Sequence, residues 1–511
     1  MRAKPNARRV TATLPKAPTG IRGLDEITRG GLPRVRPTLV CGGPGCGKTI
    51  LGLQFLIKGA QEYGEPGVFL SFEESIADVV QNLASLGLDA RALQKHKQLV
   101  LEYVQVERSE ILETGAYDLE GLFIRLGHAI DSIGAKRVVL DTIENLFAGL
   151  ADTRALRAEL RRLFNWLRAK GVTAIVTGER GDGTLTRHGL EEYVTDCVIL
   201  LDNRIVEQNA TRRLRIVKYR GSSHEADEAP FFIDEHGISV LPITSLGLQH
   251  LVLRGRMPTG VADLDTMLGG KGYFRGSSIL VSGSAGTGKS SLAGYFADAA
   301  CRRGESALYF AFEESTFQIA RNLSSIGLNL APWIRTGRLH VHAARATTSG
   351  LEGHLGQMHR MIEERRPRVV VVDPISNLIS VGTSSEVKAM LARLIDFMKM
   401  RQVTALFTSL TLDQGHPEAT DIGISSFMDT WLVLRNIETN AERTRTLDVL
   451  KSRGMHHSNQ VREFVLTSRG VRLIDVVRDD EGRALIGSER AAYTGASDVG
   501  AKRDPKRRVR R

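Results

Sequence analysis

Two adjacent glutamates occur twice in the chain, each time directly after a short apolar run. Residues 72–75 and residues 312–315 both read FEES, which gives one pair at Glu73 and Glu74 and a second at Glu313 and Glu314. Paired carboxylates can orient or deprotonate an attacking hydroxyl or water, and they can also contact a metal ion. Neighbouring side chains on a strand point to opposite faces, so both acids of a pair can serve one site only where the backbone leaves the strand.

A glycine-rich loop precedes each glutamate pair. Residues 42–49 read GGPGCGKT and residues 283–290 read GSAGTGKS, and each segment follows a β-branched run and opens a helical pattern. A loop of this type wraps backbone N–H groups around phosphate oxygens, its lysine reaches the β and γ phosphates, and its final hydroxyl can bind Mg²⁺. We therefore expect ATP to bind in both halves, at Gly45, Cys46, Gly47, Lys48, Thr49, Gly286, Thr287, Gly288, Lys289 and Ser290.

A single acid ends an apolar run in each half. KRVVLD ends at Asp141 and PRVVVVD ends at Asp373. Such runs are typical of central strands in a parallel sheet, whose carboxyl ends would place these acids and the glutamates of FEES beside the phosphate loops. All four glutamates are catalytic candidates, and the division of roles within each pair stays open. The predicted Mg²⁺ ligands are Thr49, Asp141, Ser290, Glu313 and Asp373.

Two cations recur in a late β-like run of each half. The pattern K-x-R-G gives Lys218 and Arg220 in the first half and Lys451 and Arg453 in the second. Residues two apart on a strand project from one face, where two cations suit a γ-phosphate and could be supplied by a neighbouring subunit. A solvated basic strand is the alternative interpretation.

These matching motifs reveal a duplication. PTGIRGLDEI at 18–27 aligns with PTGVADLDTM at 258–267, and the later motifs keep an offset close to 232 residues. We expect two tandem α/β domains over 14–247 and 248–490, each with a mostly parallel sheet flanked by helices, between basic tails at 1–13 and 491–511.

Composition restricts the class of protein. The net charge is +11, but ten of these charges lie in residues 1–10 and 502–511. The body is therefore nearly neutral, which argues against a nucleic-acid groove across it. No stretch is apolar enough to span a membrane, and the basic N-terminus has no apolar segment behind it. Four cysteines without metal-ligand spacing suggest reduced thiols, and we expect a cytoplasmic protein.

The combination of doubled phosphate loops, FEES acids, K-x-R-G strands, RGSSHEADEAPFFIDEHGI at 220–238 and ISSFMDT at 424–430 resembles the KaiC family of circadian-clock ATPases and autokinases. The resemblance covers residues 14–490 and implies two RecA-like domains, a homo-hexamer with ATP between subunits, and signalling or clock proteins as partners. Further nucleotide contacts that it implies are Ser85, Tyr219, Ser222, His224, Ser325 and His457.

The resemblance also implies phosphate acceptors in the second half. ISSFMD supplies Ser425 and Ser426, with Thr420 upstream, whereas the aligned first-half residues are Glu192 and Tyr193. This difference indicates ATP hydrolysis in the first half and autophosphorylation in the second. The second half departs from the family pattern at Ser426, which replaces threonine, at Pro374, which replaces a hydroxyl residue, and at Met455, which replaces a small polar residue.

Three classes of function are compatible with these motifs. The first is an ATP-hydrolysing autokinase, for which the second half carries the acceptor hydroxyls. The second is a signalling scaffold that binds nucleotide with little kinase activity. The third is a DNA-acting RecA-like motor, which the nearly neutral body disfavours.

Overall fold

The computed structural model describes residues 14–105, 119–146, 153–181, 184–186, 195–206, 209–241, 253–411, 423–439, 442–479, 481 and 484–493. The chain divides into two compact units, unit 1 at Met1–Ser245 and unit 2 at Leu246–Arg511. Within the parts of the chain just given, no helix has the length and apolar composition needed to cross a membrane.

The described part of unit 1 contains a nine-stranded sheet in the order β11-β10-β9-β8-β3-β7-β6-β4-β5. The six strands β5, β4, β6, β7, β3 and β8 are parallel to one another. Strands β9, β10 and β11 extend the sheet beyond β8, and each is antiparallel to the strand before it. The strands are β1 (Lys16–Ala17), β2 (Leu32–Pro33), β3 (Pro37–Gly42), β4 (Gly67–Ser71), β5 (Leu99–Tyr103), β6 (Arg137–Asp141), β7 (Thr173–Glu179), β8 (Cys197–Val206), β9 (Asn209–Tyr219), β10 (Ala229–Asp234) and β11 (Gly237–Val240). The helices are α1 (Leu24–Ile27), α2 (Lys48–Tyr63), α3 (Ile76–Ser85), α4 (Ala90–Lys95), α6 (Glu120–Ile133), α7 (Ile143–Leu146) and α8 (Thr153–Ala169).

Unit 2 repeats this topology in its described residues, with the order β16-β15-β17-β18-β14-β19-β20-β21-β22. The strands are β12 (Arg256–Met257), β13 (Tyr273–Phe274), β14 (Ser278–Gly283), β15 (Ala307–Ala311), β16 (Leu339–Ala343), β17 (Val369–Asp373), β18 (Thr404–Leu410), β19 (Thr430–Thr439), β20 (Glu442–Ser452), β21 (Arg462–Thr467), β22 (Gly470–Asp475), β23 (Val477–Arg478) and β24 (Ala484–Leu485). The helices are α10 (Ala262–Met267), α11 (Lys289–Arg302), α12 (Thr316–Ser324), α13 (Ala331–Arg335), α14 (Leu351–Arg365) and α15 (Ser384–Met400), with 3₁₀ turns η1 (Ala346–Thr348), η2 (Ile375–Val381) and η3 (Ser425–Phe427). The predicted α/β class with two tandem RecA-like domains is confirmed.

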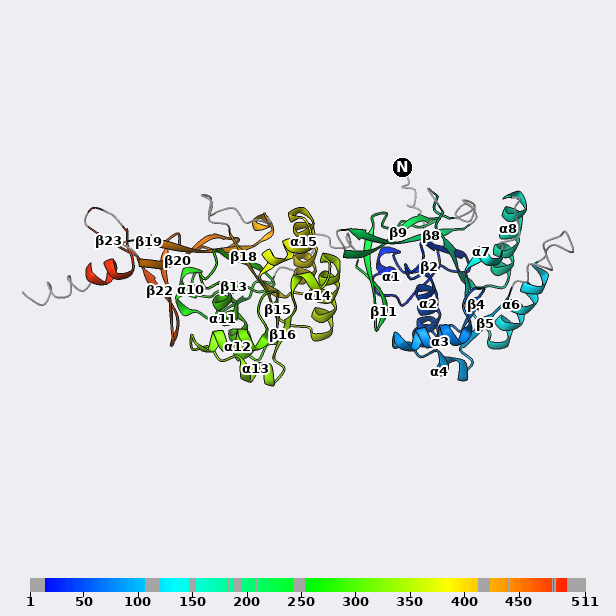
Figure 1. The fold of residues 1–511 in the computed structure, drawn as a ribbon, viewed down its shortest axis with the longest axis horizontal. Helices are drawn as coiled ribbons and strands as arrows, with labels where there is room; N and C mark the ends of the chain where they lie inside the picture. The colour runs from blue at the N-terminus through cyan, green and yellow to red at the C-terminus, as the bar shows by residue number, and fades with distance from the viewer. Residues whose placement is uncertain are drawn as a thin grey trace, which may run out of the picture. The chain divides into compact units, whose positions relative to one another are not determined.

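Alternation along the central strands builds a core on each face of the sheet. In unit 1, Phe69 and Val139 pack in a cluster with α2 and α3, while Val68 and Val138 pack in another with α6 and α8. Figure 1 shows these helices on the two sides of β4. Because successive side chains point to opposite faces, an unbroken apolar run is the sequence that a doubly covered strand requires.

A buried arginine fixes the packing of α2 against the sheet of unit 1. The Arg137 side chain is fully buried, and it donates to Glu65 Oε2 at 2.7 Å, to the Phe55 carbonyl at 2.8 Å and to the Pro18 carbonyl at 2.8 Å. Gly59 makes room for it, since a Cβ there would lie 2.4 Å from Arg137 Cδ. The guanidinium therefore keeps a full set of partners away from water, which a buried charge needs.

We expect Glu65→Ala to lower the free energy of unfolding of unit 1 by about 3 kcal/mol, because the guanidinium of Arg137 would stay buried without its counter-charge. The aligned Glu305 pairs with Arg275 and Arg303 nearer the surface, so Glu305→Ala is the matched control and should cost about 1 kcal/mol or less. Urea unfolding of the two variants checks this. Equal losses would show that burial of the ion pair is not what matters.

Candidate functional site

The phosphate loop of unit 1 lies between β3 and α2, as predicted. Gly45 and Gly47 adopt positive φ values of 69° and 101°, and a Cβ on Gly47 would lie 2.7 Å from Ile233 Cδ1. These positions therefore need glycine. The Lys48 ammonium donates to the carbonyls of Gly42 at 2.9 Å and Gly43 at 3.0 Å, so it lies folded back over the loop.

Asp141 lies at the end of β6, next to the phosphate loop. Its Oδ2 accepts a hydrogen bond of 2.7 Å from the Thr49 hydroxyl, and its Oδ1 accepts one from Thr177. Burial raises the pKa of the Asp141 carboxyl, while the hydrogen bonds from Thr177 and Thr49 and the charge of Lys48 oppose that shift. A carboxylate and a hydroxyl joined in this way form an oxygen donor set that Mg²⁺ accepts.

The backbone leaves the strand before the first glutamate pair. Strand β4 ends at Ser71, whose hydroxyl donates to the Glu74 carbonyl at 2.7 Å and accepts from the Glu74 N–H at 3.0 Å. Ser75 then caps α3 by accepting from the Asp78 N–H. FEES is thus a strand end, a turn held by a serine, and a helix cap, and this arrangement frees the two acids from strand alternation.

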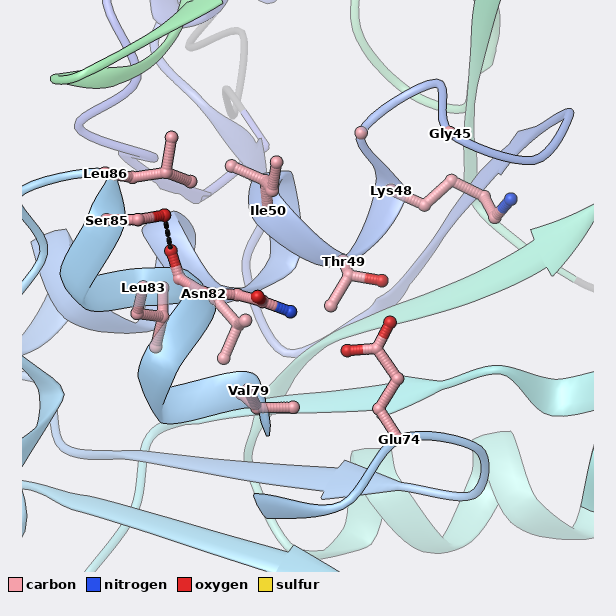
Figure 2. A pocket seen from close by; sticks show the side chains of 12 residues that line it. Gly45, Lys48, Thr49, Ile50, Glu74, Val79, Asn82, Leu83, Ser85 and Leu86 are labelled. Carbon is pink, nitrogen blue, oxygen red and sulfur yellow. Dashed lines mark hydrogen bonds between the residues drawn. The ribbon is translucent and has the colours of Figure 1, made fainter. Parts of the chain in front are cut away.

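The two acids of unit 1 have different surroundings. Both are exposed. Glu73 Oε2 accepts from the Thr142 hydroxyl at 3.3 Å, whereas Glu74 lines a cavity of about 400 Å³ together with Lys48 and Thr49. Figure 2 shows the Glu74 carboxylate and the Thr49 hydroxyl facing the same space. The part of the Glu74 side chain that lies against the protein loses hydration, which raises the Glu74 pKa, and the neighbouring charge of Asp141 adds to this shift.

Helix α3 forms the opposite wall of this cavity, where Ser85 and Asn82 contribute to the lining. The Ser85 hydroxyl donates to the Asn82 carbonyl at 2.7 Å, as Figure 2 shows. In unit 2 the aligned Ser325 makes the same local bond to Asn322 but does not belong to the lining formed by the described residues.

Unit 2 forms an equivalent site between β14 and α11. The Lys289 ammonium donates to the carbonyls of Gly283 at 2.9 Å and Ser284 at 2.7 Å, and burial lowers its pKa, opposed by Asp373 and Glu313. A cavity of about 370 Å³ is lined by residues that include Gly286, Gly288, Lys289, Ser290, Glu313, Glu314 and Asp373. Thr287 is buried beneath the loop, where its hydroxyl donates to the Ser284 carbonyl, and Cys46 is buried at the same position of unit 1.

The surroundings of the glutamates differ in unit 2. Glu314 Oε1 accepts from the Asn322 amide at 2.8 Å, and burial raises the Glu314 pKa against the lowering effect of that bond. Pro374 occupies the place of Thr142, so the hydroxyl that contacts Glu73 in unit 1 has no counterpart there. The departure seen in the sequence therefore removes one polar contact to the acid pair.

The K-x-R cations lie at the other edge of each sheet. The parallel strands all end at one edge of the sheet, which we call the carboxyl edge. They all begin at the opposite edge, which we call the amino edge. Tyr219 pairs with Cys197, which pairs with Thr38 at the start of β3, and Lys218 Nζ donates to the Thr195 carbonyl at 2.7 Å. Arg220 is exposed beside it.

The same register applies to unit 2, where Ser452 pairs with Thr430, which pairs with Ile279. Along the strand direction, the cations thus lie three to four residues, roughly 10–13 Å, from the phosphate loop of their own unit. Across the sheet, they lie two strands away, roughly 9–10 Å. Within one unit the structure does not bring these cations to the site at the carboxyl edge.

The predicted acceptors also lie at the amino edge of unit 2. Ser425 and Ser426 form the 3₁₀ turn η3, in which Ser426 is exposed. Lys451 Nζ donates to the Ser425 carbonyl at 3.0 Å, and Arg453 Nη2 donates to the Ser426 carbonyl at 2.8 Å. Thr420, like Glu192 and Tyr193 of the first half, lies outside the described residues.

The remaining nucleotide-contact candidates are also near the amino edge. The Tyr219 ring is buried and its hydroxyl donates to the Gly31 carbonyl at 2.8 Å, so this side chain belongs to the core and is not available to a nucleotide. His224 stacks on it with ring centres 6.2 Å apart. Ser222 and His457 are half-buried on the segments that follow the K-x-R-G motifs.

Several supporting contacts were missed by sequence reasoning. Thr177 and Thr408 bind the strand-end aspartates, Ser71 holds the turn before Glu74, and Tyr309 bonds to Asp373. The threonines are each the fifth residue of an apolar strand in both halves, so comparison of the halves could have found them. Tyr309 aligns with Phe69 and gave no such signal.

The fold and the paired phosphate loops define a duplicated phosphate-loop ATPase. A family model described as the KaiC ATPase matches residues 17–245 and again residues 257–477. The chain belongs to the KaiC family and carries its ATP-using domain twice.

Individual relatives agree with this assignment. The chain is 55% identical over 493 residues to the circadian clock protein KaiC2 of Synechocystis sp.. The aligned residues make up 96% of this chain and 87% of that protein. It is 36% identical over 494 residues to the circadian clock protein KaiC3 of the same organism, covering 96% and 97%. It is also 36% identical to the circadian clock oscillator protein KaiC of Parathermosynechococcus lividus, over 93% of this chain and 88% of that protein.

Proposed function

We propose that unit 1 hydrolyses ATP and that unit 2 transfers the γ-phosphoryl group of ATP to Ser425 or Ser426 of a neighbouring copy of the chain. The observation that carries this proposal is the placement of groups in unit 2. The phosphate loop and the glutamates lie at the carboxyl edge, while the serines, Lys451 and Arg453 lie together at the amino edge. Each edge holds half of what phosphoryl transfer needs.

The chemistry at the joined edges follows from the residues. The serine oxygen would bond to the γ-phosphorus as the bond from that phosphorus to the bridging oxygen of ADP breaks. Glu313 or Glu314 would take the serine proton, and Lys289 with the loop N–H groups would stabilise charge on the phosphates. Mg²⁺ held by Ser290 and Asp373 would neutralise further charge on the phosphates. In unit 1, water would take the place of the serine, with Glu73 or Glu74 as base.

Assembly would be head to tail, because one surface carries loops and acids and a different surface carries cations and acceptors. Head-to-tail contacts that close form rings, and we propose the homo-hexamer of the KaiC resemblance. Lys218, Arg220, Lys451 and Arg453 would then face the nucleotide of the adjacent copy. The clock names of the relatives support a role as a signalling or clock ATPase with protein partners.

A scaffold with a weak second site is the second candidate. Pro374 in place of Thr142 favours it, because the acid pair of unit 2 loses a hydroxyl contact. Under this alternative, nucleotide in unit 2 would stabilise the assembly without phosphorylating it.

Replacing Glu73 and Glu74 together with glutamine should lower ATP hydrolysis roughly 10²- to 10⁴-fold while nucleotide binding remains, because the amides keep the shape and remove the base. The matched pair Glu313→Gln and Glu314→Gln should instead lower phosphorylation of the protein and spare hydrolysis by unit 1. Release of free phosphate and label on the protein, both from γ-labelled ATP, are measured in parallel. Hydrolysis unchanged in the first variant would remove the glutamates from the mechanism.

Replacing Ser425 and Ser426 together with alanine should abolish label on the protein and leave hydrolysis by unit 1 intact, since unit 1 lies in a separate domain. Mass spectrometry of the wild-type chain after incubation with ATP should find phosphate on one or both serines. Ser468→Ala, in the exposed turn between β21 and β22, is the control and should label normally.

Two outcomes would contradict the acceptor assignment. Label that persists in the double alanine variant would mean another acceptor, with Thr420 the first to examine. A wild-type chain without label would favour the scaffold.

A further inference from the structure

The Asp373 carboxylate of unit 2 is held by a buried tyrosine. The Tyr309 hydroxyl donates to Asp373 Oδ2 at 2.5 Å, and the Thr408 hydroxyl donates to Oδ1. Tyr309 is fully buried in the core cluster that includes residues of α11. Among the described residues, the Ser290 hydroxyl makes no hydrogen bond to Asp373, although both groups line the same cavity.

The corresponding carboxylate of unit 1 has a different partner. Asp141 Oδ1 accepts from Thr177, which matches the contact in unit 2, but Asp141 Oδ2 accepts from the phosphate-loop hydroxyl of Thr49 at 2.7 Å. The aligned position to Tyr309 is Phe69, which has no hydroxyl to offer. One oxygen of the carboxylate therefore accepts from a threonine in both units. The donor to the other oxygen is a phosphate-loop hydroxyl in unit 1 and a core tyrosine in unit 2.

The sheet register explains how the tyrosine reaches the carboxylate. In unit 2, β15 pairs with β17 so that Ala311 lies opposite Asp373, and Tyr309 is two residues earlier on the same face. In unit 1, Ser71 lies opposite Asp141, and Phe69 is two residues earlier. The two rings thus occupy equivalent places, and the phenolic oxygen is the difference. A buried tyrosine hydroxyl needs a hydrogen-bond partner, and Asp373 supplies it.

We propose that Tyr309 is a positioning residue that holds Asp373 away from Ser290, so that unit 2 binds the divalent metal of its nucleotide more weakly than unit 1 does. This inference rests on the proposed metal site at Ser290 and Asp373. In unit 1 the loop hydroxyl and the strand-end carboxylate are joined as one donor set, whereas in unit 2 the core takes one carboxylate oxygen from that set. Replacing a partner that supports a metal ligand usually costs roughly 10- to 100-fold in metal affinity. Tyr309 would act in the opposite sense, because its hydroxyl occupies the Asp373 oxygen whose counterpart in unit 1 is bonded to the loop hydroxyl.

Tyr309→Phe tests the inference, because it gives unit 2 the aromatic ring that unit 1 has at this position. Mn²⁺ is titrated into the full chain in the presence of a non-hydrolysable ATP analogue, and free Mn²⁺ is followed by electron paramagnetic resonance. The wild-type chain should show two classes of site, and Tyr309→Phe should tighten the weaker class about tenfold toward the stronger one. Phe69→Tyr, the reciprocal change, should weaken the stronger class.

Tyr273→Phe is the matched control, since Tyr273 is also fully buried but lies outside the contacts of Asp373; it should leave both classes unchanged. Two results would overturn the inference. One is that Tyr309→Phe leaves the affinities of both classes of site unchanged. The other is that Tyr309→Phe weakens Mn²⁺ binding at the weaker class further, which would mean that the tyrosine hydroxyl orients Asp373 for the metal. A wild-type chain that binds no Mn²⁺ with the nucleotide would instead contradict the proposed metal site itself.

Discussion

All parallel strands of a sheet end at the same edge, and this constraint determines where chemistry can lie in each unit. The phosphate loop follows β3 or β14, the aspartate ends β6 or β17, and the glutamates follow β4 or β15. These strands are neighbours or near neighbours, so the loop, the candidate metal-binding acid and the candidate bases meet at the carboxyl edge. The antiparallel strand that carries K-x-R necessarily finishes at the amino edge, which separates the cations from the site they would complete.

The two units use one backbone plan with different side chains at a few positions. Thr177 donates to the strand-end aspartate in unit 1, and Thr408 does so in unit 2. The lysine of each phosphate loop donates to the same two carbonyl positions of its loop. The differences near the acids include Thr142 against Pro374, Phe69 against Tyr309, Ser71 against Ala311 and Thr49 against Ser290. In unit 1, Thr142 contacts Glu73, Ser71 contacts the Glu74 backbone and Thr49 contacts Asp141, whereas in unit 2 Tyr309 contacts Asp373. A duplicated fold can thus diverge in chemistry without changing its sheet.

Much of this arrangement could be predicted from the sequence, because the signals are local. A glycine-rich loop between an apolar run and a helical pattern places Lys48 and Lys289, and unbroken apolar runs place Asp141 and Asp373 at strand ends. The burial of Tyr219 could not be predicted from K-x-R-G alone. The alternation of side chains on a strand predicts that Tyr219 faces away from Lys218, but it does not predict the hydrogen bond from the Tyr219 hydroxyl to the Gly31 carbonyl. The bond from Tyr309 to Asp373 depends on the register of two strands distant in sequence, which no local pattern encodes.

We propose that a working site needs the carboxyl edge of one copy of the chain and the amino edge of another. Mixing two full-length variants tests it most directly: an isotope-labelled Lys289→Ala chain keeps its serines but has a disabled loop, and a Ser425→Ala, Ser426→Ala chain keeps its loop but has no acceptors. Each alone should stay without phosphate in unit 2, and the mixture with ATP should place phosphate on the serines of the isotope-labelled chain. A mixture that stays unphosphorylated under conditions where the wild-type chain is phosphorylated would contradict the claim.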